Sequence, residues 1–248
     1  MIKLFRKIRQ KLLTENKLSK YLLYAFGEIV LVVIGILIAL QFNNWNTINQ
    51  IREVEIKYLK EIAKNLDSDM DDIQFNINFN ETRNRAIEIV LNSLQSDEGY
   101  SDTLDIYFGS LLYTTRSVVD YSAFDALKSQ GLEIISNDSL RQLISRLYSY
   151  HYHNVIDFEI QDDHAMQYEI VMPRVLSRLK IRKGEGSDPS QQLASPIDFD
   201  ALKLDDEFKN SLIMNKDLRE YMLINYRGLK KIVNICRVAI ERELKTHE

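Results

Sequence analysis

The chain has 248 residues with 8 glycines and 3 prolines, while 45% of its residues are hydrophobic and 27% are charged. Few residues interrupt secondary structure and many suit amphipathic helices, so the composition predicts an all-α protein. The net charge of −4 does not favour nucleic-acid binding, which needs a basic face. The single cysteine excludes a disulfide within the chain.

The first 20 residues are strongly basic, with seven Lys or Arg and one Glu. Apolar residues such as Ile2 and Phe5 recur near one side of a helix, a pattern that suits a segment lying on anionic lipid. The residues expected to contact lipid headgroups are Lys3, Arg6, Lys7, Arg9 and Lys11. The simpler alternative is that these charges only set the direction in which the next segment crosses a membrane.

A long apolar segment follows. Residues 22–42 contain one charged residue, Glu28, and a helix of this length matches the hydrocarbon thickness of a bilayer, about 30 Å. Tyr21, Tyr24 and Trp45 bracket the segment at the depth of the headgroups, where aromatic residues are typical. The sequence therefore predicts one transmembrane helix.

The charges beside the span predict its orientation. Seven Lys or Arg precede it and three follow within about 20 residues, so the N-terminus should remain in the cytoplasm. A cleaved signal peptide is the competing interpretation, but Leu37-Ile38-Ala39 is a poor cleavage site and the apolar stretch is long for such a peptide. We favour an uncleaved signal anchor. The predicted parts are a basic amphipathic cytoplasmic segment over 1–20, a transmembrane helix over 21–43 and an extracytoplasmic helical domain over 44–248.

Glu28 is the unusual residue of the span, because a carboxylate there must reach the headgroups, be protonated or pair with another group. Gly27, Gly35 and Ala39 form a strip of small residues where another helix could approach closely and cover Glu28. We expect either a carboxylate tolerated at the interface or a helix-packing contact in an oligomer.

The stretch IRQKLLTENKLSKYLLYAFGEIVLVVIGILIALQFNNWN, Ile8 to Asn46, resembles the N-terminus of a bacterial family of unknown function. ALKSQGLEIISNDSLRQLI, Ala126 to Ile144, is similar to the same family. The resemblance implies a single-span protein of the inner membrane of Gram-negative bacteria with a helical periplasmic domain. It implies no activity, and no catalytic residues can be transferred.

Apolar periodicity after the span predicts a bundle of two or three long antiparallel helices with short helices across them. The first long helix should run to about residue 95, with an interruption allowed at the Asn-rich stretch that ends the span. Short helices are expected at about 102–114 and 119–129. Ser122 and Asp125 resemble a capping box for the latter, and Gly131 is a natural stop.

Asn137 or Asp138 should cap a second long helix that Pro173 kinks or ends. Its expected apolar side comprises Leu140, Leu143, Ile144, Leu147, Val155, Phe158, Ala165 and Met172. Residues 184–197 hold two glycines and two prolines and are the clearest predicted loop. The last helix should be capped by Asp217.

Two side-chain clusters have residue types that can bind a metal ion. The acidic run from Asp67 to Asp72 lacks the Gly and Glu that an EF-hand needs at its sixth and twelfth positions, so a solvated helix face is favoured. His153, Asp157 and His164 recur at intervals of four and seven residues and could share a helix face, but a solvent-facing polar side is the ordinary explanation. We predict no metal and no cofactor.

Catalytic motifs are not found in the sequence, which has no nucleophile elbow, no glycine-rich phosphate loop and no His-Glu-x-x-His. Cys236 falls on an apolar stripe and should be a buried, inert thiol. We therefore expect a non-enzymatic membrane-anchored module that binds a protein or ligand outside the cytoplasm, as a homo-oligomer or with another membrane or periplasmic protein. The alternative is an accessory subunit of an energised membrane complex in which Glu28 couples to protons.

Overall fold

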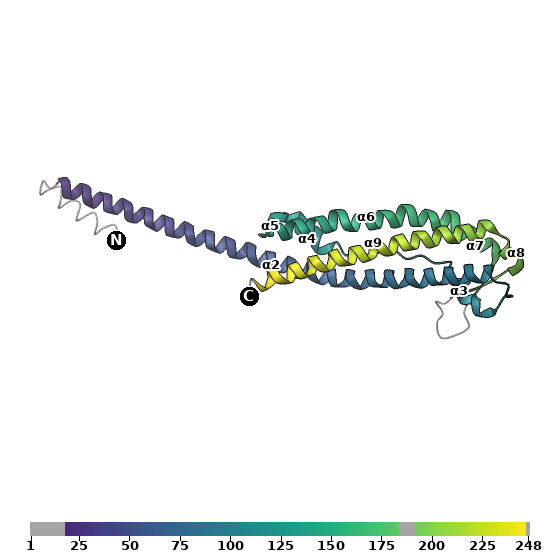
Figure 1. Cartoon of the computed structure of the whole chain (residues 1–248). Helices are drawn as coiled ribbons and strands as arrows, with labels where there is room; N and C mark the ends of the chain where they lie inside the picture. The colour runs from purple at the N-terminus through teal and green to yellow at the C-terminus, as the bar shows by residue number, and fades with distance from the viewer. Residues whose placement is uncertain (1–17, 184–191, 247–248) are drawn as a thin grey trace. The chain divides into compact units, whose positions relative to one another are not determined.

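A computed structural model describes residues 18–183 and 192–246, and the chain is 84% helical (Figure 1). The all-α prediction is confirmed. The predicted headgroup contacts Lys3, Arg6, Lys7, Arg9 and Lys11 lie outside the described residues. By its internal packing the chain divides into two units, Met1–Val54 and Glu55–Glu248.

The first unit contains the beginning of helix α2, which runs from Leu18 to Gln95. This helix holds an 18-residue window with a mean hydropathy of 2.4, long and apolar enough to cross a membrane, and none of the window is buried. The interruption allowed at the Asn-rich stretch does not occur. Thr47 Oγ1 instead donates to Asn43 O, at 3.0 Å, within an unbroken helix.

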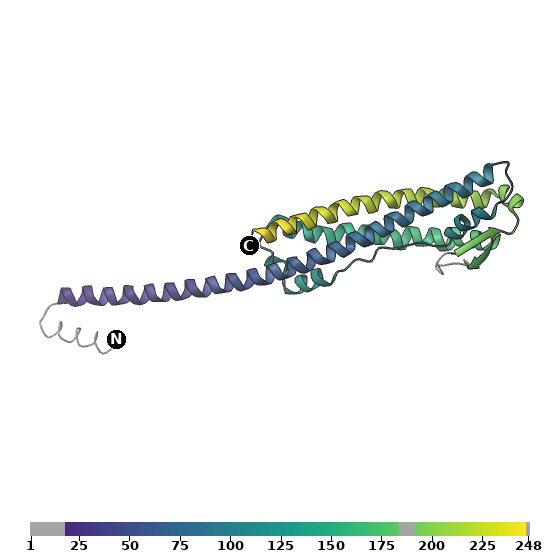
Figure 2. The same ribbon diagram turned by 90° about the horizontal axis from the view of Figure 1, so that it is seen from below.

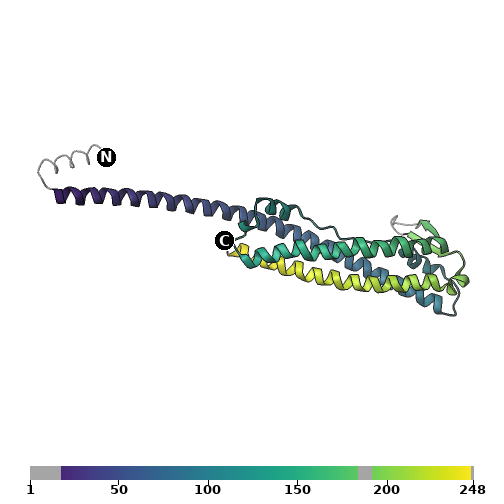
Figure 3. The same cartoon turned by 90° about the horizontal axis from the view of Figure 1, so that it is seen from above.

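The second unit is a bundle of three long helical paths, which lie side by side in all three views (Figures 1, 2 and 3). They are the part of α2 after Val54, a composite path over residues 138–178, and α9 (Asp206–Lys245). The first two paths run in the same direction and α9 runs against them (Figure 1). The predicted antiparallel order therefore holds only for α9, because the chain crosses back along the bundle between α3 (Asp105–Ser110) and α4 (Ser122–Gln130).

On both α2 and α9 one series of buried positions alternates at intervals of four and three residues, the repeat of helices packed nearly parallel to one another; a few further residues beside the series, such as Tyr58 and Leu223, are also buried. On α2 these positions are Glu55, Leu59, Ile62, Leu66, Asp69, Ile73, Asn76, Asn80, Arg83, Ile87, Val90 and Leu94. On α9 they are Phe208, Leu212, Asn215, Arg219, Met222, Tyr226, Leu229, Val233, Cys236 and Ile240. Both sets are polar in the middle and, apart from Glu55 at the start of the α2 set, apolar at their ends.

The composite path alternates α-helical and π-helical turns. Its parts are α5 (Asp138–Arg146), η3 (Leu147–His151), α6 (Tyr152–Phe158), η4 (Glu159–Asp163), η5 (Met166–Val171) and α7 (Met172–Arg178), of which η3, η4 and η5 are π-helical. Hydrogen bonds from i to i+5 widen the turn, so the buried face recurs at every fourth residue. From Val155 the buried residues are Glu159, Asp163, Gln167, Val171 and Val175.

The inner face predicted from α-helical periodicity is correct for Leu140, Ile144, Leu147 and Val155, which are buried, and wrong for the part of the path after Val155. Phe158, Ala165 and Met172 are only partly buried, because the π-helical turns rotate Glu159, Asp163 and Gln167 inward instead. The path also continues through Pro173 to Arg178. Pro173 is the second residue of α7 and directly follows the π-helical turn η5, so it lies within the path and does not end it.

The predicted caps are partly correct. Gly131, with φ of 110°, ends α4, and the Asn137 side chain caps α5 by accepting from Ser139 N and Leu140 N. The capping box at Ser122 is wrong, because Asp120 Oδ1 accepts from Ser122 N and Ser122 lies inside the helix. The Asp217 cap is also wrong. The last helix begins at Asp206, after the Asp205 side chain accepts from Phe208 N.

A small antiparallel hairpin, β1 (Leu179–Lys183) and β2 (Gln192–Pro196), replaces the second part of the loop predicted over 184–197. Residues 184–191 of that loop lie outside the described residues. The strand forms because Ala194 is buried and because β2 packs on α3, where a Cβ on Gly109 would lie 1.9 Å from Gln192 O. Short helical pieces complete the second unit: η1 (Asp102–Leu104), η2 (Leu132–Ile134) and α8 (Phe199–Lys203).

Two apolar regions occupy the ends of the second unit. One joins residues 87–94 of α2 to α3, α7, the hairpin, α8 and the start of α9 through buried side chains such as Phe108, Val171 and Phe208. The other is aromatic: the rings of Phe124 and Tyr148 stack with centroids 4.3 Å apart, and Tyr152 lies beside them. Between these regions the bundle interior is polar.

Candidate functional site

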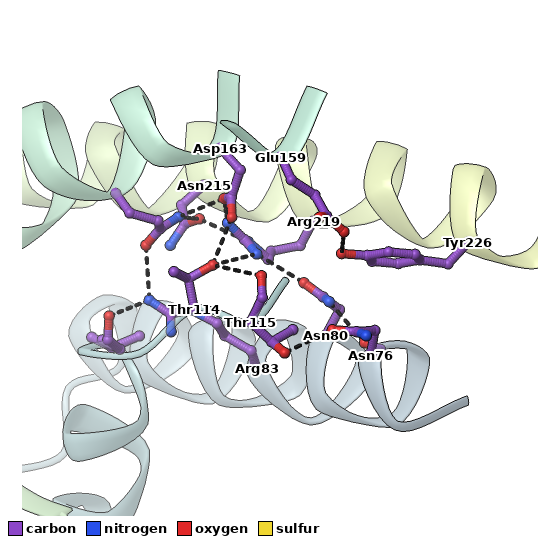
Figure 4. A network of polar contacts seen from close by, with 12 residues as sticks. Asn76, Asn80, Arg83, Thr114, Thr115, Glu159, Asp163, Asn215, Arg219 and Tyr226 are labelled. Atoms are coloured by element: carbon purple, nitrogen blue, oxygen red, sulfur yellow. Dashed lines mark hydrogen bonds and ion pairs between the residues drawn. The ribbon is translucent and has the colours of Figure 1, made fainter. Parts of the chain in front are cut away.

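The polar part of the interior brings together side chains from all three paths and from the extended segment after α3 (Figure 4). We call it the polar layer, defined by Asn76, Asn80, Arg83, Thr114, Thr115, Glu159, Asp163, Gln167, Asn215, Arg219 and Tyr226. α2 and α9 supply Asn76 to Arg83 and Asn215 to Tyr226 at heptad positions. The π-helical turns supply Glu159, Asp163 and Gln167.

Arg219 and Asp163 form a fully buried ion pair at the centre of the polar layer. Arg219 Nη1 also donates to Asn80 Oδ1 at 2.9 Å, and Arg219 Nε donates to Asn215 Oδ1 at 3.2 Å. Thr114 Oγ1 donates to Asp163 Oδ2 at 2.6 Å. Burial lowers the pKa of Arg219 to about 10, so the guanidinium is still charged at neutral pH. The pair therefore links α9 to the composite path and, through Asn80, to α2.

Arg83 is the second buried guanidinium, and only 2% of it is exposed. Its Nη2 donates to two neutral acceptors, Leu111 O and Gln167 Oε1, the latter at 2.9 Å. Its Nε and Nη1 are shielded from solvent and have no hydrogen-bond acceptor among the described residues. Burial, and then repulsion from Arg219, hold the pKa of Arg83 well below its usual range. Arg83 is thus a cation without an anionic partner in the described part of the chain.

Carboxylates on the helices hold the extended segment between α3 and α4. Glu159 accepts from Ser117 N at 2.9 Å and from Tyr226 Oη at 2.6 Å. Asp72 Oδ2 accepts from Val118 N at 2.9 Å. The segment forms no helix or sheet of its own, so these bonds give its backbone N–H groups partners and hold it against the helices.

Asp69, three residues before Asp72 on α2, also holds the extended segment, because its Oδ1 accepts from Asp120 N at 3.1 Å. Its Oδ2 accepts from Tyr152 Oη at 2.6 Å. Burial raises the pKa of Asp69 to about 6, and it also raises the pKa of Tyr152. The interpretation of Asp67 to Asp72 as a solvated face is therefore wrong for Asp69, which is 2% exposed.

Two hollows border the polar layer. One, of about 730 Å³, is lined by the segment after α3 and by the composite path, including Thr115, Glu159 and His164. The other, of about 390 Å³, is lined by α2, α3 and β2, and Arg83 is among its lining residues. Its remaining walls are largely apolar and aromatic, with Phe75, Phe79 and Ile106.

The structure brings two of the three weighed metal ligands together. His153 Nε2 lies 3.1 Å from Asp157 Oδ2 on an exposed face, whereas the His164 ring contacts Tyr168 at 4.4 Å between centroids. Within residues 18–183 and 192–246, no group of three or more His, Cys, Asp or Glu side chains is placed to hold a metal ion. Cys236 is fully buried on α9, and burial raises the pKa of its thiol to about 12.

In the first unit, Glu28 is partly exposed and lines a shallow hollow of about 360 Å³ with Ala25, Ile29, Val32 and Val33. A Cβ on Gly27 or Gly35 would meet no atom within 4 Å, so the strip that they form with Ala39 is open on the helix surface. The Trp45 ring lies edge-on to Phe42, with centroids 6.2 Å apart. The side chains of Tyr21 and Tyr24 are outside the described part.

Periodicity could have revealed part of the polar layer before the structure. Asn76, Asn80 and Arg83 continue the four-three spacing of the apolar residues before and after them on α2, and Asn215 and Arg219 do so on α9. A polar residue at such a position faces the partner helices. Glu159, Asp163 and Gln167 gave no such indication, because their inward placement depends on the π-helical turns.

The fold and the polar layer define an all-helical bundle protein with one apolar N-terminal helix. A family model described as a family of unknown function (DUF6090) matches residues 28–172, more than half of the chain. The chain belongs to this family, as the resemblance of its first 46 residues predicted. No curated protein and no solved structure matches the chain.

Proposed function

We propose that the protein is a single-pass membrane-anchored module whose helical bundle binds a protein or a small ligand outside the cytoplasm, without catalysing a reaction. The observation that carries the proposal is the exposure of every residue from Ile29 to Leu40, along a helix with large apolar side chains. A continuous apolar surface of this extent is typical of contact with lipid or with another protein.

The charges beside the apolar helix support an orientation with the N-terminus in the cytoplasm. Seven Lys or Arg lie in the first 20 residues, and this excess favours retention of that side. In a bacterial inner membrane, the bundle that follows would then lie in the periplasm.

Binding is favoured over catalysis by the way in which the polar layer is used. Asp163 accepts a hydrogen bond from Thr114 and Glu159 accepts one from Ser117 N, both in the extended segment, and Arg219 donates one to Asn80 on α2. The three charged side chains therefore hold the helical paths and the segment together. The two hollows beside the layer, of about 390 and 730 Å³, have the size of small-molecule binding sites.

A second class of function is favoured by the hollow at Glu28, which places a carboxylate on the apolar helix beside an open surface. Ionisable residues within a span tend to be functional. In this alternative the protein is an accessory subunit of an energised membrane complex, and Glu28 couples to protons together with a multi-span partner.

The test is purification of the tagged full chain in native lipid patches, after an alkaline carbonate wash of the membranes. Wild type is compared with Glu28→Gln and with the matched control Glu53→Gln, which removes an exposed carboxylate beyond the apolar segment. We expect all three proteins to stay in the washed membranes and to bring down the same partners. Release by carbonate would overturn anchoring. Loss of a multi-span protein with Glu28→Gln alone would favour the proton-coupling alternative.

A further inference from the structure

Arg83 has no anionic partner among the described residues, and it lines a hollow that no side chain fills. The hollow, of about 390 Å³, opens between α2, α3 and β2, and its rim residues Phe75 and Tyr113 are 60% and 49% exposed. The hollow therefore opens to solvent. Arg83 is the charged residue of this lining, and the polar residues beside it are neutral: Asn78, Thr82, Ser110, Tyr113 and Gln192.

The buried guanidinium is unusual because it has no anion. Among the described residues no carboxylate lies within ion-pairing distance of Arg83, whereas Arg219 on α9 pairs with Asp163. Burying an unpaired cation costs several kcal/mol, and each N–H left without an acceptor adds to that cost. A chain that only needed packing here would be served better by an apolar residue.

We propose that this hollow binds a small amphipathic carboxylate, with its acid group on Arg83 and its apolar body against Phe75, Phe79 and Ile106. A carboxylate supplies the acceptors that Arg83 Nε and Nη1 lack, and charge-assisted bonds of this kind are stronger than bonds to neutral acceptors. The volume and the apolar walls suit an organic acid with an aromatic or branched aliphatic body.

Binding requires a small rearrangement, because both nitrogens are shielded from solvent. Tyr113 and Gln192, which both line the hollow, are linked by a hydrogen bond between their side chains, in which Tyr113 Oη donates to Gln192 Oε1. Tyr113 is half-exposed and can turn outward without unpacking a helix. Exposed side chains change rotamer on a nanosecond timescale, so this contact is one that an incoming ligand can replace.

The inference rests on the proposed binding function but not on the membrane orientation, and the two can fail separately. The full chain in lipid nanodiscs is titrated with 4-phenylbutyrate and with its neutral counterpart 4-phenylbutanol, with empty nanodiscs as the blank. We expect saturable binding of the acid at least tenfold tighter than that of the alcohol, a difference of about 1.4 kcal/mol. Absence of saturable binding of the acid would overturn the proposal and leave the carbonate-wash result untouched.

Two pairs of variants locate the site. Arg83→Met should abolish the preference for the acid, because it removes the cation that the acid group would bind. Arg116→Met removes an exposed arginine outside this hollow and should keep the preference. Thr82→Trp should fill the hollow and weaken binding at least tenfold, whereas Asn92→Trp, on an exposed face of the same helix, should not.

If Arg83→Met does not fold, the comparison of Thr82→Trp with Asn92→Trp decides. An unchanged affinity for the acid in Thr82→Trp, or an unchanged preference in a folded Arg83→Met, would contradict the assignment of the hollow.

Discussion

Three carboxylates of the bundle, two of them buried, accept hydrogen bonds from backbone N–H groups of a segment that has no regular structure. Asp69, Asp72 and Glu159 each bond to a different residue between Ser117 and Asp120. An irregular segment lacks the regular backbone hydrogen bonds of a helix or sheet, so its N–H groups need other partners. The acids therefore explain how residues 112–121 can cross the bundle without forming a helix or a strand.

Asp69 gives the stability of the protein a distinctive pH dependence. Its pKa is about 6 in the folded chain, against an ordinary value of 3.8 for an aspartate in an unfolded chain. Between pH 3.8 and pH 6 the Asp69 carboxyl is protonated in the folded chain and ionised in the unfolded chain. The free energy of unfolding therefore rises as the pH falls through 6. A shift of about two units corresponds to at most about 3 kcal/mol.

We therefore expect Asp69→Asn to flatten the difference in unfolding free energy between pH 7.5 and 5, as measured by urea unfolding of the full chain in nanodiscs followed by circular dichroism. The matched control is Asp71→Asn, which changes an exposed carboxylate two residues away and should keep the wild-type profile. A wild-type profile in Asp69→Asn would show that Asp69 is not the group responsible.

Gly109 is the residue at which α3 and β2 come closest. A Cβ there would lie 1.9 Å from Gln192 O, which is backbone and cannot rotate away. Gly109→Ala should therefore displace the hairpin and destabilise the chain by about 1–3 kcal/mol, the usual cost of overpacking.

Gly99→Ala is the control for this substitution, because a Cβ at Gly99 would meet no atom within 4 Å. It should change stability by less than about 0.5 kcal/mol. Equal effects of the two substitutions in urea unfolding would contradict the close packing of α3 on β2.

At the scale of the elements, the caps differ from the sequence pattern in a way that can be measured. Asn137→Ala removes the acceptor for Ser139 N and Leu140 N and should cost about 1 kcal/mol in unfolding free energy. Ser122→Ala should cost only a few tenths, because Asp120 rather than Ser122 accepts at the start of α4. The reverse order in urea unfolding would restore the capping box that the sequence suggested.

The long helices were predictable because their apolar residues repeat over many turns. α2 ends at Gln95, where the periodicity ends, and Gly131 and Asn137 mark boundaries for the ordinary reasons of helix capping. The start of α9 was placed too late because Asp217 resembles a cap, whereas Asp205 makes the capping bond. Several acidic residues near the start of this helix could cap it, and the local sequence does not distinguish Asp205 from the others.

The hairpin and the polar layer needed tertiary information. β2 lies in a stretch rich in Ser, Gln and Pro, and it is ordered by contact with α3 rather than by its own propensity. The inward placement of Glu159 and Asp163 depends on π-helical turns that no α-helical pattern predicts. The candidate site was therefore found from the structure, although Arg83 and Arg219 already stood at heptad positions in the sequence.

At the scale of the whole molecule, the two units require different surroundings. The second unit buries its apolar side chains between α2, the composite path and α9. The first unit exposes them from Ile29 to Leu40. An apolar helix of this length attached to a domain with its own core is the arrangement expected of an anchored module. We propose that this helix spans a membrane and leaves the bundle outside the cytoplasm.

Cysteine labelling in intact cells of a Gram-negative host tests that claim most directly. Cys236 is fully buried with a raised pKa, so the wild-type chain should give little background with a membrane-impermeant maleimide. Ser68→Cys places a thiol on an exposed position of the bundle, and Ser19→Cys places one before the apolar segment in the sequence. With the outer membrane permeabilised, we predict labelling of Ser68→Cys in intact inner membranes and of Ser19→Cys only after lysis. Labelling of Ser68→Cys only after lysis would contradict the account.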